Sequence, residues 1–334
     1  MKIVVYGAGS IGCYLGAVLL SQGMDVVLLG RERLKKVIQQ REGIRLTDYQ
    51  ERDDFVANIA YSTDPTTLSQ ADVVLVTLKC TAMEQAAEAL SNYVQDGCLI
   101  VCLQNGIGAE LPVKQAVQQA EVVCGIVPFN VVQGEQAHFH RATEGSVYLP
   151  QHRSLHPIQD AFSHYGLACE LRSDMKAVIW GKLMLNLNNA INALSDLPLK
   201  QELSQRGYRK VLAKCQQELL QVCQRKGIEL AQLTSVKPHW LPRILLLPDW
   251  LFQILAQKML AIDPQARSSM WEDIQAGRET EIQFLNGAVS SIAEEVGLSA
   301  PVNKVVAQQL RLLSENSISA PISARALLSQ LSQV

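Results

Sequence analysis

The stretch KIVVYGAGSIGCYLGAVLLSQG, residues 2–23, decides the fold of the first half of the chain. A short apolar run leads into three glycines in G-x-G-x-x-G spacing, and a helix-like apolar segment follows up to Gly23. A glycine pattern alone is weak evidence, but a strand before it and a helix after it are the context of a dinucleotide-binding loop. The sequence therefore predicts a nucleotide-binding βα unit here, and a tight turn that binds no ligand is the alternative.

Each glycine of this loop has its own expected role. Gly7 permits the tight turn, Gly9 lets the backbone approach a pyrophosphate, and Gly12 allows close packing of the helix on the strand. The helix N-terminus adds unpaired N–H groups and a positive dipole end, both of which favour phosphate. The loop residues predicted to bind the cofactor are Gly7, Ala8, Gly9, Ser10, Ile11 and Gly12.

The end of the next predicted strand, residues 25–33, bears on which dinucleotide binds. A site for NAD(H) usually has an Asp or Glu there that binds the ribose 2′-hydroxyl, but here Gly30 and Arg31 occupy that place. An arginine forms charge-assisted hydrogen bonds with a 2′-phosphate, which an acid would repel. The sequence thus predicts NADP(H), with Arg31 at the phosphate and Arg33 as a second candidate. Glu32 weighs against this assignment, and a solvated loop charge is the alternative for Arg31.

More strands of the same sheet follow. Continuous Val/Leu/Ile runs, typical of parallel strands covered on both faces, occur at residues 71–79, 97–106 and 121–129. Because ligands bind beyond the carboxyl ends of such strands, Lys79 and Asn105 at two of these ends are predicted to contact the cofactor. The alternating segment 136–150 predicts antiparallel strands that close the sheet.

From about residue 175 onward, apolar residues recur at the three- and four-residue spacing of amphipathic helices. Helices are predicted at residues 175–195, 203–226, 250–262, 269–296 and 300–316. The expected architecture is an α/β Rossmann-type domain at residues 1–173 followed by an all-α domain at residues 174–334. Two such domains leave a cleft, a common place for a ligand site.

The segment WGKLMLNLNNAINAL, residues 180–194, carries four asparagines although asparagine is a poor helix former. At about 100° per residue, Asn186 and Asn189 lie roughly 40° and 20° to either side of Lys182, so the three form one polar stripe. Asn192 falls at the edge of this stripe, and Asn188 points away from it. One ammonium with two or three amides suits an oxoacid, because amides donate to the carboxylate and the ammonium reaches the carbonyl oxygen. The alternative is a solvent-facing stripe, although such faces favour Glu, Lys, Gln and Arg over Asn.

A second polar cluster lies in ARSSMWEDIQAGRETEIQFLNG, residues 266–287. Its candidates are Ser268, Ser269, Asp273, Arg278 and Glu281. Ser269 and Glu281 lie about 120° apart on a straight helix, so they share a ligand only if the helix bends, for example at Gly277, or if the ligand lies between them. Arg278 with Glu281 alone is more typical of an exposed ion pair.

The composition weighs against several kinds of partner. With 48% hydrophobic and 19% charged residues the chain is globular, and a net charge of −2 without a long basic run opposes nucleic-acid binding. Eight cysteines without a CxxC pair favour free thiols in a reducing cytoplasm. No metal site is predicted, because His138 and His140 lack nearby Cys or carboxylate ligands and fit one face of a strand better.

No membrane segment is expected either. The N-terminus starts directly with a predicted strand, without the regions of a signal peptide. The longest apolar region, residues 239–262, is broken by prolines and charged residues and is too interrupted to span a bilayer. We expect a cytoplasmic protein in which the helix at 250–262 is buried or forms a homodimer contact.

Five pieces of the sequence together resemble the ketopantoate reductase (2-dehydropantoate 2-reductase) family. They are GAGSIG, TLK ending at Lys79, QNG with Asn105, WGKLMLN, and SSMWEDIQAGRETEIQFLNG. They follow the family's order across almost the whole chain, and their combination is specific although no single piece is. The resemblance implies NADPH-dependent reduction of 2-dehydropantoate (ketopantoate) to pantoate, a step toward coenzyme A. It also implies a helical domain like the C-terminal domain of 6-phosphogluconate dehydrogenase.

The resemblance further implies roles for individual residues. Lys182 would donate the proton to the ketone oxygen, and Glu281 would bind the substrate hydroxyl and help to set the protonation state of the lysine. Arg31 and Lys79 would contact the NADP end of the cofactor. The residues that would hold substrate are Asn105, Asn186 and Ser269, and Asn189 is a further candidate on the polar stripe. Hydride attack at C2 builds an alkoxide, which a nearby ammonium stabilises and protonates.

Two departures from the family's pattern bear on the substrate. Many members have an asparagine eight residues after the lysine, and here that position is Ala190, with Asn189 or Asn192 as the candidate replacement. Residues 236–262, rich in Leu, Trp and Pro, resemble an insertion beside the substrate cluster. The alternatives are therefore a reductase of another bulky 2-oxoacid or an imine, and a non-catalytic NADPH-sensing protein. The joint presence of the substrate-side residues weighs against the sensor.

Overall fold

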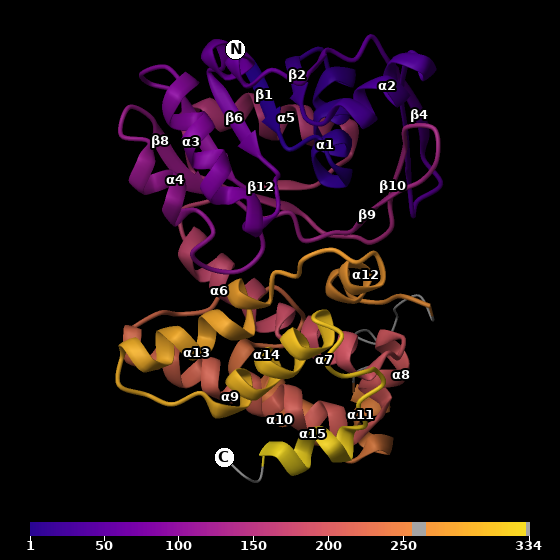
Figure 1. The fold of residues 1–334 in the computed structure, drawn as a ribbon, viewed down its shortest axis with the longest axis vertical. Coiled ribbons are helices and arrows are strands. Elements are labelled where there is room, and N and C mark those ends of the chain that lie inside the picture. The colour runs from indigo at the N-terminus through magenta and orange to yellow at the C-terminus, as the bar shows by residue number, and fades with distance from the viewer. Residues whose placement is uncertain (256–264, 332–334) are drawn as a thin grey trace. The chain divides into compact units, whose positions relative to one another are not determined.

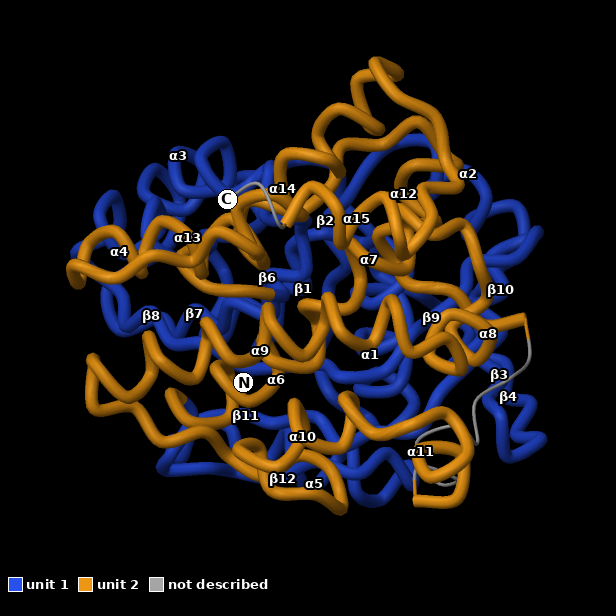
Figure 2. The backbone as a smooth tube through the Cα atoms, turned by 90° about the horizontal axis from the view of Figure 1, so that it is seen from below, with its two compact units in different colours: residues 1–105, 109–175 blue, residues 106–108, 176–334 orange. Residues whose placement is uncertain are grey.

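The computed structural model describes residues 1–255 and 265–331, and the chain divides into two compact units. The first unit comprises residues 1–105 and 109–175, and the second comprises residues 106–108 and 176–334 (Figure 2). Each unit has its own hydrophobic core. Because residues 106–108 belong to the second unit, the chain passes from one unit to the other three times.

Six parallel strands form the main sheet of the first unit, in the order β5-β2-β1-β6-β7-β8. Figure 1 labels β1, β2, β6 and β8 of this sheet. The strands are β1 (Lys2–Tyr6), β2 (Asp25–Leu29), β5 (Tyr61–Ser62), β6 (Val73–Val76), β7 (Leu99–Cys102) and β8 (Glu121–Cys124). The strand order reverses between β1 and β6, which is the switch point where such sheets bind ligands. The parallel sheet confirms the predicted Rossmann-type first half.

Helices complete the first unit. They are α1 (Ser10–Ser21), α2 (Glu32–Arg41), α3 (Met83–Tyr93), α4 (Leu111–Ala116) and α5 (His156–Tyr165), with 3-10 turns η1 (Pro65–Gln70), η2 (Cys80–Ala82) and η3 (Arg153–Leu155). Helix α1 is buried over most of its length, and Gly16 lets it approach β1 and β2 closely, because a Cβ atom there would lie 2.3 Å from Leu28 Cδ2 and 3.3 Å from Val5 Cγ2.

The prediction for residues 136–150 is right about antiparallel pairing, which joins residues 139–141 to residues 131–133 and Tyr148 to Ile126. It is wrong that these strands close the main sheet. A separate sheet has the order β4-β3-β10-β9, formed by β3 (Gly43–Asp48), β4 (Asp53–Ala57), β9 (Val131–Gln133) and β10 (His138–Arg141). Strand β10 runs parallel to β3, and β11 (Val147–Pro150) pairs in parallel with β12 (Cys169–Arg172). The alternating pattern is real, because Phe139 is fully buried, but partners distant in sequence determine the pairing.

The second unit is helical, as predicted. Its helices are α6 (Met175–Asn186), α7 (Asn188–Ser195), α8 (Leu199–Ser204), α9 (Arg206–Lys226), α10 (Leu241–Leu245), α11 (Asp249–Leu255), α12 (Ser269–Gln275), α13 (Asn286–Glu295), α14 (Pro301–Ser314) and α15 (Ala324–Leu331), with 3-10 turns η4 (Pro238–Trp240) and η5 (Ile282–Phe284). The predicted helix 175–195 is interrupted at Leu187, which keeps helical backbone angles. The predicted helix 250–262 is described only as far as residue 255, and the rest lies outside the described residues.

A single helix over residues 269–296 was the wrong prediction. Helix α12 ends at Gln275, and Gly277 adopts a φ of 61°, which turns the chain out of the helix. The N–H of Arg278 then donates to the carbonyl oxygen of Asp273 at 2.8 Å and completes this helix end. Ser269 and Glu281 therefore lie on different elements, and a helical angle between them has no meaning.

One side of the described part of the predicted insertion, residues 236–255, packs into the core of the second unit. Leu241, Leu245 and Phe252 are almost fully buried. The guanidinium of Arg209 in α9, itself fully buried, lies 4.1 Å from the ring centroid of Phe252. Its N–H groups donate at 2.8–3.0 Å to the carbonyl oxygens of Leu203, Leu245 and Leu247.

Candidate active site

In the glycine loop of the first unit, Gly7 and Gly12 have no room for a side chain, whereas Gly9 borders open space. Gly7 has a φ of 113°, and a Cβ atom there would lie 2.6 Å from the backbone nitrogen of Leu78. At Gly12 a Cβ atom would lie 2.4 Å from the carbonyl oxygen of Gly7. At Gly9 it would meet only that same oxygen, at 3.9 Å. Protein packing thus explains Gly7 and Gly12, whereas the open space at Gly9, the N-cap of α1, fits a phosphate approaching the helix N-terminus.

Hydrogen bonds attach this loop to the ends of the neighbouring strands. The N–H groups of Gly7 and Ala8 both donate to the carbonyl oxygen of Leu29 at 3.0 Å, and the hydroxyl of Thr77 donates to the carbonyl oxygen of Gly7 at 2.8 Å. Arg31 is exposed at the N-cap of α2, two residues beyond β2. The loop and Arg31 therefore lie at the same edge of the main sheet, its carboxyl end.

Lys79 and Asn105 follow β6 and β7 at that same edge, and side chains outside the predicted set connect their loops. The amide nitrogen of Gln104 donates to the carbonyl oxygens of Val76 at 2.9 Å and Leu78 at 3.0 Å. The buried thiol of Cys80 donates to the carbonyl oxygen of Asn105 at 3.2 Å. Contacts on both sides of Lys79 thus bind its loop to the strand end that bears Asn105. The position of Gln104 at this strand end follows from the sequence, but its bonds to the loop of Lys79 and the role of Cys80 do not.

In the second unit, Lys182 and Asn186 lie one turn apart on α6. Asn186 is buried. Lys182 keeps part of its surface exposed, yet burial of the ammonium group lowers its pKa to about 8. A lysine whose pKa lies near neutrality can give and take a proton under physiological conditions, as general acid–base catalysis requires.

Two asparagines of the same segment belong to the protein core rather than to a ligand site. The amide nitrogen of Asn192, which is fully buried, donates to Glu202 Oε2 and to the carbonyl oxygen of Leu197, both at 2.8 Å. Asn188 donates to the same Glu202 oxygen at 3.3 Å. Burial raises the pKa of Glu202 to about 8. Asn192 is therefore excluded as the replacement for the family's asparagine, and Asn189 is the remaining candidate.

Asn192 also orients the start of α12, where Ser269 lies. Its side-chain oxygen Oδ1 accepts a hydrogen bond from the backbone N–H of Ser268 at 2.8 Å. The Ser268 hydroxyl donates to the carbonyl oxygen of Asn189 at 3.0 Å and accepts from the N–H of Trp271 at 3.2 Å, as an N-cap. The structure therefore brings Ser269 next to α7 through its buried neighbour Ser268.

Glu281 precedes η5, and the segment that follows Asn105 in sequence packs on this turn. The N–H of Ile107 donates to the carbonyl oxygen of Phe284 at 3.0 Å. Gly106 has a φ of 86°, and a Cβ atom there would lie 2.2 Å from that same oxygen. The glycine of QNG is thus required by the turn that begins at Glu281. The other candidate of this region, Arg278, pairs with Asp273 at 2.9 Å.

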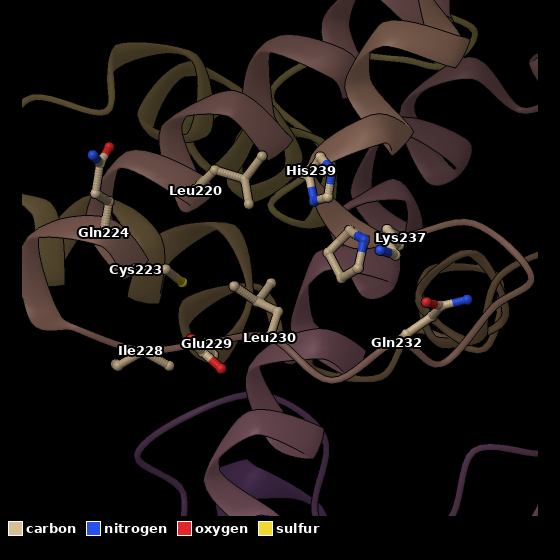
Figure 3. A pocket seen from close by; sticks show the side chains of 10 residues that line it. Leu220, Cys223, Gln224, Ile228, Glu229, Leu230, Gln232, Lys237 and His239 are labelled. Atoms are coloured by element: carbon tan, nitrogen blue, oxygen red, sulfur yellow. The ribbon is translucent and has the colours of Figure 1, made fainter.

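A cavity of about 420 Å³ in the second unit lies elsewhere (Figure 3). It is lined by the end of α9 and the following loop, including Leu220, Cys223, Leu230, Lys237 and His239, and by none of the predicted site residues.

The described residues also bear on metals and membranes. Among residues 1–255 and 265–331, no three His, Cys, Asp or Glu side chains are grouped so as to hold a metal ion. His138 and His140 lie on one face of β10, as predicted, and His138 Nε2 and His140 Nδ1 lie 2.7 Å and 2.8 Å from the Thr47 hydroxyl. Over the same residues, none of the helices has the length and apolar character needed to cross a bilayer.

Comparison with known proteins covers both units. Residues 3–154 match the family described as ketopantoate reductase PanE/ApbA, and residues 174–314 match its C-terminal family. The 2-dehydropantoate 2-reductase of Halobacterium salinarum is 25% identical over 318 residues, 93% of this chain and 98% of that protein. That of Pyrococcus horikoshii is 27% identical over 313 residues, 91% and 94% of the two chains.

Solved structures share the fold over nearly the whole chain. A PanE/ApbA family ketopantoate reductase from Ralstonia eutropha has a TM-score of 0.81 at 25% identity, covering 95% of this chain and 99% of that chain. A D-mandelate dehydrogenase in complex with NADH and anilino(oxo)acetate has a TM-score of 0.75 at 19% identity, with the same coverage.

Proposed function

Because the chain belongs to the ketopantoate reductase family, we propose that it reduces 2-dehydropantoate to pantoate with NADPH. It is an oxidoreductase of the 2-dehydropantoate 2-reductase type, in a family that uses a nicotinamide cofactor. The observation that carries the proposal is Lys182, whose burial lowers its pKa to about 8 and which lies one turn before the buried Asn186.

In the proposed reaction, the chain's own residues bind, orient and protonate. The bound nicotinamide supplies a hydride to C2 of the 2-oxoacid. Lys182 stabilises the alkoxide that forms and donates a proton to its oxygen. Glu281 binds the substrate hydroxyl, and the residues that hold substrate are Asn105, Asn186, Asn189 and Ser269.

The cofactor is proposed to be NADP(H). The open space at Gly9 leaves room for the pyrophosphate, and the loop residues Gly7, Ala8, Gly9, Ser10, Ile11 and Gly12 surround it. Arg31, exposed at the start of α2, binds the 2′-phosphate, with Lys79 as a second contact.

A second candidate substrate is another bulky 2-oxoacid. Residue 190, where many family members have asparagine, is a fully buried alanine, and the amide of Asn192 is already used by the protein. The similarity to a D-mandelate dehydrogenase fold supports testing aromatic 2-oxoacids as well.

The experiment is NADPH oxidation by the purified protein with ketopantoate, and with phenylglyoxylate in parallel. We expect turnover with ketopantoate, and Lys182→Ala should lower kcat by about two orders of magnitude or more, the scale of a lost general acid. NADPH binding should survive this substitution. Faster turnover of phenylglyoxylate would identify the second candidate as the substrate, and unchanged turnover in Lys182→Ala would contradict the mechanism.

Association and location are proposed on other grounds. Trp250, Ile254 and Leu255 of α11 expose more than half of their surface, and a dimeric ketopantoate reductase from Staphylococcus aureus shares the fold. We therefore propose that α11 contributes to a homodimer contact, which analytical ultracentrifugation of Trp250→Lys would test. All eight cysteines are free thiols, which supports the proposed cytoplasmic location.

A further inference from the structure

The residue directly after β2, Gly30, has no room for a side chain. Its N–H donates to the carbonyl oxygen of Ser62 at 3.0 Å, and its backbone is not in the left-handed region. A Cβ atom at this position would lie 2.3 Å from the hydroxyl oxygen of Tyr61 and 2.7 Å from the Cβ of Ala8. Space, rather than backbone conformation, therefore restricts residue 30 to glycine.

Backbone pairing of the edge strand β5 places Tyr61 there. Leu28 pairs with Tyr61, and Leu29 pairs with Ser62, in parallel register. The Tyr61 hydroxyl donates to the carbonyl oxygen of Arg31 at 3.1 Å. Burial raises the pKa of Tyr61, so the hydroxyl remains a donor. One side chain thus fills the space over residue 30 and fixes the backbone of residue 31.

Residues 30 and 31 are also the place where NAD sites and NADP sites differ. An acidic side chain at the end of this strand binds the ribose 2′-hydroxyl of NAD, whereas an arginine nearby accommodates the 2′-phosphate of NADP. We propose that Tyr61 is a specificity-determining residue, which denies position 30 an acidic side chain and holds Arg31 for a 2′-phosphate. This inference rests on the proposed preference for NADP(H).

The first experiment removes only the hydroxyl. NADPH and NADH are titrated separately into wild type and Tyr61→Phe, with cofactor fluorescence as the readout and no substrate present. The Kd of NADPH should rise about three- to tenfold, the scale of one hydrogen bond, while the Kd of NADH should stay unchanged. Tyr93→Phe, at the end of α3, is the matched control and should change neither Kd. Equal changes for both cofactors in Tyr61→Phe would overturn the proposal.

The second experiment opens the space around position 30. Gly30→Asp alone should weaken both cofactors, because the new side chain must displace Tyr61 and Ala8. In an Ala8→Gly/Tyr61→Ala background, Gly30→Asp should instead lower the Kd of NADH about tenfold relative to that background, the scale of a charge-assisted hydrogen bond. A similar gain in both backgrounds, or no gain in the opened one, would overturn the proposal.

The same titrations separate this inference from the proposed function. If wild type binds neither dinucleotide, the proposed reductase itself fails. If wild type binds NADPH and NADH equally well, the reductase proposal survives without its cofactor preference, and the role of Tyr61 is refuted.

Discussion

At the scale of single residues, the ionisation of Lys182 sets the pH range of the proposed reaction. Burial lowers the pKa of Lys182 to about 8, so the ammonium is lost as the pH rises through that value. Because reduction consumes its proton and this pKa is that of the free enzyme, we expect kcat/KM for reduction to be level below about pH 8 and to fall about tenfold per unit well above it. A pH–rate profile measures this, and a level rate up to about pH 10 would exclude Lys182 as the donor.

Glu202 gives a second pH effect, which acts on stability rather than on the rate. Burial raises the pKa of Glu202 from 4.5 to about 8, so the folded chain holds a proton that the unfolded chain has lost between these values. The free energy of unfolding must then fall as the pH rises from about 4.5 to about 8. Glu202→Gln removes this loss and retains an acceptor for Asn188 and Asn192.

Thermal unfolding of wild type and Glu202→Gln checks this expectation. The variant should have the higher Tm near pH 8, with the difference shrinking toward pH 5. A difference of the same size at both values would contradict it, since an uncharged packing effect does not depend on pH.

The roles of the asparagines could be predicted only in part. Helical periodicity correctly places Asn186 with Lys182 on one helix, but it assigned Asn192 to the edge of the stripe. The partners of Asn192 are Glu202 and Ser268, on other elements, and periodicity carries no information about them. Buried amides that satisfy a distant carboxyl group have the same local pattern as amides that face a ligand.

At the scale of elements, Arg209 fixes α10 and α11 onto α9. It is fully buried and donates to three backbone carbonyl oxygens. Arg209→Met leaves these acceptors without their donor, so we expect the free energy of unfolding to fall by about 3 kcal/mol or more. Urea denaturation measures this loss.

The control for Arg209 lies on the same helix. Arg206→Met also removes a guanidinium, one that donates to the carbonyl oxygen of Leu246 from an exposed position. Water can replace an exposed donor, so this variant should lose about 1 kcal/mol or less. Equal losses in the two variants would show that the burial of Arg209 contributes nothing.

Elements were predictable where their signals are local. The parallel strands follow from continuous apolar runs, and α1 follows from the glycine loop. The prediction for residues 136–150 was only partly right because an alternating pattern identifies a buried face but not the partner strand, and β10 pairs with β3, over 90 residues away along the sequence. The segment 269–296 failed because the left-handed turn at Gly277 outweighs the continuing helical periodicity.

At the scale of the whole molecule, residues 106–108 belong to the second unit although the first unit precedes and follows them in the sequence. Gly106→Ala places a methyl group 2.2 Å from the carbonyl oxygen of Phe284. We expect the turn after Glu281 to shift, with a rise in the KM of the 2-oxoacid of about tenfold, the effect of a small displacement of binding groups. Steady-state kinetics measures it.

Gly97→Ala is the matched control. Gly97 has a φ of 81°, similar to that of Gly106, but nothing lies within 4 Å of its added Cβ atom. Both variants should lose about 1 kcal/mol of stability through the left-handed backbone. Gly106→Ala should lose more because of its contact with Phe284, and only Gly106→Ala should change KM. An unchanged KM in Gly106→Ala would show that the contact with Phe284 does not position substrate groups.

Because the chain passes between the two units three times, hybrids made by joining two relatives at one point do not exchange whole units. In a chimaera joined near residue 174, one relative supplies the N-terminal half and another supplies the C-terminal half, so the helical unit is exchanged without its residues 106–108. Residues 106–108 of its helical unit then come from the relative that supplies the N-terminal half, and the rest of that unit comes from the other relative. Such hybrids should be mismatched at the contact between Ile107 and Phe284. Replacing residues 106–108 by those of the relative that supplies the C-terminal half should restore this contact.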